Sequence, residues 1–229
     1  MSLAARRVLS LAAVTFAAGL AAPALALIVP FTETFASPAA NWSSALAFTP
    51  LTYPASGGPD GSGYASRSLS FANLASGEQP LIFRGQSNFN SSGNAFVGNW
   101  ITGGGGGGVT EFSFSVRHDA PEPVDFFARF APAAGPGIVA LQFPGAQPGV
   151  WTTYTVAINP SAPFIYEGTT FAGVFANLAR VQVGIIVSDT LAGQTPDFTF
   201  DIDNVSIVPA PGAAALIGLL ALAGLRRRR

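Results

Sequence analysis

The chain has no cysteine, no lysine and a single histidine among its 229 residues. Without cysteine, neither a disulfide framework nor a thiolate metal site can form. A Ser–His–Asp triad would have only His118 as its base. Asp119 and Pro121 follow this histidine and predict a strand end or a turn, so we expect His118 at the surface.

Positive charge is scarce in the central part of the chain. All twelve acidic residues lie between Glu33 and Asp203, whereas six of the eleven arginines lie outside this span. The span therefore has five arginines against twelve acids, a formal charge of −7. Nucleic-acid binding needs clustered Lys and Arg to neutralise phosphates, so this balance argues against a nucleic-acid partner.

The N-terminus has the three parts of a secretory signal peptide. Arg6 and Arg7 are a positive start, Val8 to Leu20 are an apolar run, and Ala24-Leu25-Ala26 supply the small residues that signal peptidase needs. We predict a signal peptide over residues 1–26, cleaved after Ala26. The alternative is a permanent N-terminal membrane helix.

The C-terminus contains a second apolar run. Residues 212–225 are uncharged, and a helix of these 14 residues would be roughly 21 Å long, short of the roughly 30 Å hydrocarbon core. Arg226, Arg227, Arg228 and Arg229 would stay in the cytoplasm by the positive-inside rule. Pro209 and Pro211 break any helix before the run and predict an accessible extended stretch. We predict a short transmembrane helix that acts as a transient tether to the inner membrane.

This tail resembles the PEP-CTERM sorting signal of exopolysaccharide-producing bacteria. The matching residues are Val208, Pro209 and Pro211 and the arginines at 226–229, whereas Ala210 stands where the motif has glutamate. The resemblance implies processing of residues 209–229 by a membrane-embedded exosortase and transfer to the cell surface or extracellular matrix. A plain C-terminal anchor is the alternative.

Between the two ends, in residues 27–208, alternation of apolar and polar side chains with period two recurs. This pattern is typical of strands, and it occurs in four segments, which are 110–117, 124–130, 151–158 and 180–187. Phe171, Val174, Phe175 and Leu178 instead have helical spacing and predict one short helix. Abundant glycine (26) and proline (18), with glycine-rich stretches at 56–63 and 103–108, predict loops between strands. The sequence predicts an antiparallel β-sandwich.

The C-terminal half also resembles the laminin-B and carbohydrate-binding-module type of galactose-binding-like jelly roll. The residues that carry the likeness are "GVWTTYTVAI", "FAGVFANLARVQVGI" and "FTFDIDNVSIV". The resemblance implies a jelly-roll sandwich, a structural calcium ion and binding to sugar or matrix.

Two irregularities of the pattern suggest where calcium would bind. Glu33 lies in the apolar stripe of "IVPFTETFA", and a buried carboxylate needs a cation or several donors. In "DFTFDIDNVSIV" the apolar phase slips near Asp203, as at a β-bulge. Pairing of the first and last strands would bring Glu33 near Asp203 and Asp201, whose oxygens suit Ca²⁺. We therefore predict a calcium site of Glu33 and Asp203, with Asp201 less favoured; the alternative is that Glu33 pairs with an arginine or reaches solvent.

Sugar binding requires exposed aromatic rings. Trp100 and Tyr64 lie beside glycine-rich loops and are the candidates, with core packing or loop anchoring of Trp100 as the alternative. Trp151 begins a strand and is expected in the core. We predict an exported, non-catalytic module associated with exopolysaccharide. Carboxylate pairs such as Glu122 with Asp125 leave open a secreted hydrolase of matrix glycans, and a purely structural surface protein is a third interpretation.

Overall fold

The chain folds as an all-β antiparallel sandwich, as the alternating pattern predicted. The computed structural model describes residues 30–103 and 107–210. Its first sheet consists of β1 (Phe31–Glu33), β2 (Ala65–Ser70), β4 (Val109–His118), β7 (Thr152–Ala157) and β10 (Asp197–Pro209). Its second sheet has the order β3 (Leu81–Gln86), β9 (Arg180–Ile185), β5 (Val124–Ala131), β6 (Ile138–Ala146) and β8 (Ile165–Tyr166).

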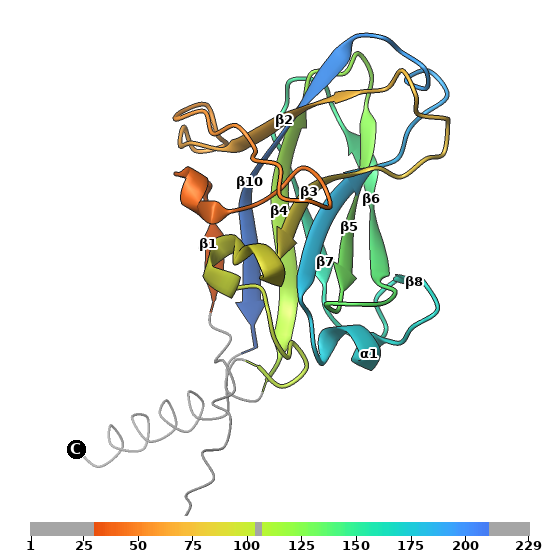
Figure 1. The fold of residues 1–229 in the computed structure, drawn as a ribbon. Helices are drawn as coiled ribbons and strands as arrows, with labels where there is room; N and C mark the ends of the chain where they lie inside the picture. The colour runs from red at the N-terminus through yellow and green to blue at the C-terminus, as the bar shows by residue number, and fades with distance from the viewer. Residues whose placement is uncertain (1–29, 104–106, 211–229) are drawn as a thin grey trace, which may run out of the picture.

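The predicted helix is confirmed as α1 (Phe171–Phe175), which begins where the Thr170 hydroxyl accepts a hydrogen bond from the Gly173 N–H at 3.0 Å. In Figure 1, α1 lies at the same end of the molecule as β8 and far from β2. Three 3₁₀ turns complete the described elements: η1 (Pro38–Ala40), η2 (Ser87–Phe89) and η3 (Ser91–Asn94).

The long strand β10 organises the first sheet. On one side it pairs with β4, and on the other with β2 over Asp197–Ile202 and with β1 over Val205–Ile207. The predicted pairing of first and last strands is thus confirmed (Figure 1). The strand ends at Pro209, one residue beyond the predicted domain boundary, and Pro209 is buried opposite Val109.

A β-bulge interrupts β10 where the sequence predicted a phase slip. Asp203 is opposite Ser115 on β4, but the next paired residue is Ser206, opposite Ser113, so β10 has one extra residue. Asn204 takes up the irregularity with a left-handed backbone (φ 48°). Phe200 and Ile202 before the bulge, and Val205 and Ile207 after it, are all buried although their parity differs.

The core lies between the sheets and is rich in phenylalanine. Trp100 belongs to it: the side chain is 1 % exposed, stacks on Phe175 at 5.8 Å between ring centroids, and donates its indole N–H to the Phe96 carbonyl. The expectation of an exposed ring at Trp100 was therefore wrong. The glycine-rich loop beside Trp100 suggested exposure, but the ring packs inward against Phe112 and Phe130.

Candidate functional site

The three acidic residues of the predicted calcium site lie on or near the β10 bulge. Asp203 is fully buried, because the glycine-rich loop at 57–63 covers it: a Cβ at Gly58 would lie 2.6 Å from its Oδ2. Its Oδ2 accepts a hydrogen bond from the Ser62 hydroxyl (3.2 Å) and its Oδ1 one from the Asn204 N–H (2.8 Å). Burial raises the pKa of Asp203 to about 6, and the charges of Asp60 and Glu33 add to this effect.

Glu33 is partly buried at the end of β1, and its Oε1 accepts a hydrogen bond from the Phe35 N–H at 2.9 Å. Among the described residues it forms no salt bridge with an arginine. Its charge acts on Asp203, and it also helps burial to raise the pKa of Tyr53 to about 12. Glu33 and Asp203 therefore share one electrostatic environment, as the strand pairing predicted.

Asp201, the less favoured ligand, is held by an arginine. Arg117 on β4 lies directly opposite it. Its Nε donates a hydrogen bond to Asp201 Oδ2 at 2.9 Å, and its Nη2 forms a salt bridge with the same oxygen at 2.8 Å. Asp201 Oδ1 is buried and has no hydrogen-bond partner within residues 30–103 and 107–210. In the same part of the chain, no three His, Asp or Glu side chains gather in a metal-binding group.

Arg117 is also the centre of an aromatic cluster on the outer side of the first sheet. Its guanidinium lies 4.9 Å from the Tyr64 ring centroid and 4.7 Å from that of Trp151. Both rings are half-buried, and they meet edge to face at 5.6 Å. The Trp151 indole N–H donates to the Gly57 carbonyl at 2.9 Å.

The prediction that Trp151 packs in the core was therefore wrong, and a signal in the sequence pointed the other way. Tyr154, Val156 and Ile158 are the inward-facing residues at the C-terminal end of the predicted strand, and all are buried. Trp151 has the opposite parity, which places it on the outer face together with Tyr64.

A hollow of about 350 Å³ lies beside this cluster, and we call it the aromatic hollow. Polar groups surround it, and its lining residues are Tyr64, Arg117, His118, Asp119, Gly149, Thr199 and Asp201. It thus combines a half-buried tyrosine ring with the carboxylate groups of Asp119 and Asp201. Such a combination can stack on a sugar ring and bind its hydroxyl groups.

His118 is buried, so the expectation of a surface histidine was wrong. It is 1 % exposed at the end of β4, stacks on Phe200 at 5.9 Å, and its Nε2 lies 2.8 Å from the Ala146 carbonyl oxygen. Burial lowers its pKa, which favours the neutral ring with Nε2–H as the donor. Its parity matches that of Phe112, Phe114 and Val116 on the same strand, a signal that outweighs the turn residues after it.

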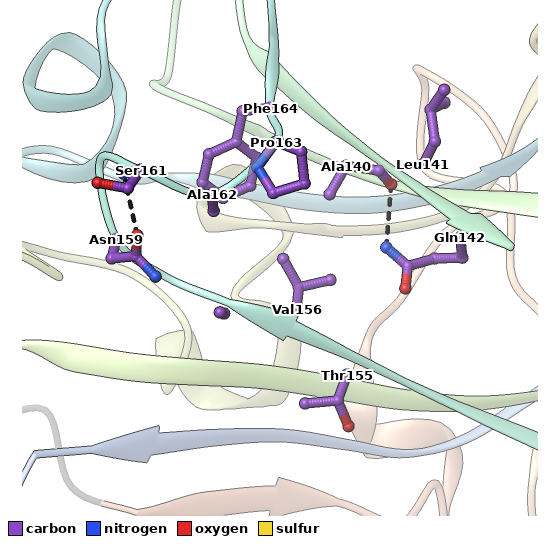
Figure 2. Close-up of a pocket in the computed structure, with 11 residues that line it drawn as sticks. Ala140, Leu141, Gln142, Thr155, Val156, Asn159, Ser161, Ala162, Pro163 and Phe164 are labelled. Atoms are coloured by element: carbon purple, nitrogen blue, oxygen red, sulfur yellow. Dashed lines mark hydrogen bonds between the residues drawn. The ribbon is translucent and has the colours of Figure 1, made fainter.

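A second concave site, a groove of about 330 Å³, lies between β6 and β7. Figure 2 shows Ala140 and Gln142 of β6 on one side, Thr155 and Val156 of β7 on the other, and the loop to Phe164 closing it. Every lining residue is uncharged, and its one aromatic residue, Phe164, is 9 % exposed. The groove therefore offers little aromatic surface for a sugar.

Of the sorting-signal residues, the structure describes only Val208 and Pro209, at the end of β10. Val208 is 44 % exposed and Pro209 is buried, so the stretch before the apolar run belongs in part to the sandwich. Pro211 and the arginines at 226–229 lie outside the described residues, as does the signal peptide. Within residues 30–103 and 107–210, no helix has the length and apolar character needed to cross a bilayer.

No protein-family model and no curated protein matches the chain. Among solved structures, it is similar to the family 11 carbohydrate-binding module of a cellulosomal cellulase of Clostridium thermocellum, with 12 % identity and a TM-score of 0.49 over 81 % of this chain and 97 % of that one. It is also similar to the CBM22-1–GH10 modules of a Clostridium thermocellum endo-1,4-β-D-xylanase complexed with xylohexaose (15 % identity, TM-score 0.48, 79 % of this chain). An exo-β-agarase gives 11 % identity and a TM-score of 0.49 over 80 % of this chain. The alignment spans 28 % of the xylanase chain and 25 % of the agarase chain.

Proposed function

We propose that the chain is an exported, non-catalytic module that binds neutral sugar units of an exopolysaccharide in the aromatic hollow. The observation that carries this proposal is the juxtaposition of Tyr64, Trp151 and Asp201 on an outward-facing surface. Arg117 holds this arrangement rigidly, because it contacts both rings and the carboxylate. A rigid site loses little conformational entropy on binding, which favours recognition of a flexible polymer.

Binding fits the described residues better than hydrolysis does. His118 is buried among aromatic rings and faces the Ala146 carbonyl, so it has no access to a nucleophile. Asp201 is ion-paired, and Glu122 accepts hydrogen bonds from the hydroxyls of Ser188 and Thr190. These contacts engage one oxygen of Asp201 and both oxygens of Glu122 within the protein.

Trp151→Ala and Tyr64→Ala test the aromatic hollow. Each variant is expected to weaken binding of the best neutral glycan on an array about tenfold, roughly 1.4 kcal/mol, because Tyr64 lines the hollow and Trp151 supports its ring edge to face. Isothermal titration of the purified full chain measures this effect. Tyr166→Ala is the control, since that ring is 40 % exposed on the second sheet. Equal weakening by all three substitutions, or none by the first two, would contradict the assignment.

Export through the two terminal segments is a further part of the proposal. Signal peptidase would remove residues 1–26, and an exosortase would process the tail that starts at Pro209. We expect the protein recovered outside the cell to have the mass of a chain that lacks both segments. Mass spectrometry of the exported protein measures this directly, and a mature product that still contains Arg229 would show an ordinary anchored protein instead.

We also propose that Asp203 and Glu33 hold a structural calcium ion. Asp203 supports this proposal, because it is a fully buried carboxylate near two other acids. It has no arginine partner among the described residues. Carboxylate and backbone carbonyl oxygens are the ligands that calcium prefers. Bound calcium would offset the repulsion among the acids and fix the loop at 57–63 onto β10, next to the aromatic hollow.

Calcium is expected to raise the melting temperature of the metal-free full chain. At a concentration 100-fold above the dissociation constant the gain is about 2.7 kcal/mol, which corresponds to roughly 5–10 °C for a domain of this size. Asp203→Asn should abolish the gain, and Asp197→Asn, at an exposed position on the same strand, should retain it. The site is disproved if millimolar calcium leaves the wild-type melting temperature unchanged.

A further inference from the structure

Three of the five arginines of the sandwich lie on the outer side of the second sheet. Arg84 on β3 is directly opposite Gln182 on β9, which is opposite Arg129 on β5, so the three form one row across the sheet. In the next row, Gln86 on β3 is opposite Arg180 on β9. We call these five residues the arginine face. They have the opposite parity to the buried Phe83, Val183 and Ala128, and therefore point away from the core.

Two of these arginines have partners within the protein. Arg129 donates from Nε (2.7 Å) and Nη2 (2.6 Å) to the two carboxylate oxygens of Glu167, and from Nη1 to Oε1 of Gln182 at 2.7 Å. Arg180 donates to the carbonyl groups of Pro132 (2.6 Å) and Gly135 (2.9 Å). These contacts hold both side chains in place. The three arginines of this face thus have one carboxylate, that of Glu167, as their counter-charge.

Arg84 has no such partner. Within residues 30–103 and 107–210, no carboxylate lies within salt-bridge distance of it, and its buried Nε has no hydrogen-bond partner. All twelve Asp and Glu side chains of the chain are among these described residues, so no acidic side chain elsewhere can serve. Asp125 has the same parity as Arg129 on β5, but four residues, roughly 13 Å, separate them.

A second unpartnered donor lies beside Arg84. Gln86 is two residues further along β3 on the same face, is 6 % exposed, and its Nε2 has no partner in the described part of the chain. A buried donor without a partner is costly, and a cation without a counter-charge more so. Burial and the charges of Arg129, Arg67 and Arg180 lower the pKa of Arg84, which remains protonated at neutral pH. An anion at the Arg84 guanidinium would supply the missing counter-charge.

We propose that the arginine face binds the carboxylate groups of an acidic polysaccharide, with the half-buried Arg84 guanidinium as the donor that reaches the anion. Arginine suits carboxylates because its planar fork can donate two parallel hydrogen bonds. The local excess of two positive charges matches the carboxylates of one or two neighbouring sugars, whereas a nucleic acid needs a longer basic surface than this face provides. That the polymer is a glycan rests on the proposed function. The site itself is separate, because it lies on the second sheet and the aromatic hollow lies on the first.

Polygalacturonate and its fully methyl-esterified form are a matched pair of probes, because they share one backbone and differ in charge. The purified full chain is expected to bind the acid at least tenfold more tightly than the ester, with an affinity that falls as salt rises. Arg84→Gln should remove most of this preference, and Arg84→Lys, which keeps the charge without the fork, should retain part of it. Affinity electrophoresis measures binding, and thermal melting confirms that each variant is folded.

Gln147→Glu is the matched control. It changes the net charge by the same one unit at an exposed turn after β6, so it should change the affinity for the acid less than twofold. Equal binding of acid and ester, or equal effects of Arg84→Gln and Gln147→Glu, would overturn the inference. If Arg84→Gln does not fold, the test uses Arg84→Lys. Binding of the acid by Arg84→Lys that is unchanged from the wild type, as it is for Gln147→Glu, would overturn the inference. In each of these cases, loss of neutral-glycan binding in Trp151→Ala would still support the proposed function.

Discussion

The left-handed residue Asn204 in the middle of β10 is the constraint on which the first sheet depends. A regular strand through this segment would turn either Phe200 and Ile202 or Val205 and Ile207 toward solvent, since side chains alternate between faces. The extra residue lets all four reach the core. Because β10 pairs with β1, β2 and β4, the same irregularity determines where each of these strands lies against it.

The bulge also sets the chemistry of the outer surface. Asp201 and Asp203 both point outward before it, but they meet different partners. Asp201 lies opposite Arg117, whose guanidinium also organises the rings of Tyr64 and Trp151. Asp203, two residues on, lies beneath the glycine loop with Ser62 and without a cation among the described residues. One strand thus supplies both the polar part of the aromatic hollow and the proposed metal ligand.

Charge is distributed unevenly between the two sheets. Glu33, Asp60 and Asp203 are close together without a described arginine partner, whereas Arg84 faces two further arginines without a free carboxylate. An arrangement chosen only for stability would place opposite charges together. The proposed cation on the first sheet and the proposed anion on the second would each offset one of these two charge excesses.

The sequence predicted what short-range periodicity determines and missed what depends on packing between distant segments. Two-residue alternation predicted β4, β5, β7, β9 and the β10 bulge. Helical spacing predicted the short helix, and the pairing of the first and last strands followed from a general tendency of such sandwiches. Parity also pointed to buried His118 and outward Trp151, but adjacent turn residues and a general expectation for tryptophan were given more weight. Trp100 lies outside any strand, so its burial against Phe175 and Phe130 required the tertiary structure. The arginine face required the register between β3, β9 and β5.

The bulge is tested most directly by the relative stability of Asn204→Gly and Asn204→Val in urea unfolding. Glycine adopts a positive φ freely, whereas an L-residue in the left-handed region is strained by roughly 1–2 kcal/mol, and a β-branched one suffers most. The glycine variant is expected to unfold within about 1 kcal/mol of the wild type, and the valine variant is expected to be clearly less stable than the glycine variant. In a regular strand valine is favoured over glycine, so a valine variant as stable as the glycine variant, or more stable, would show that residue 204 does not form a left-handed bulge.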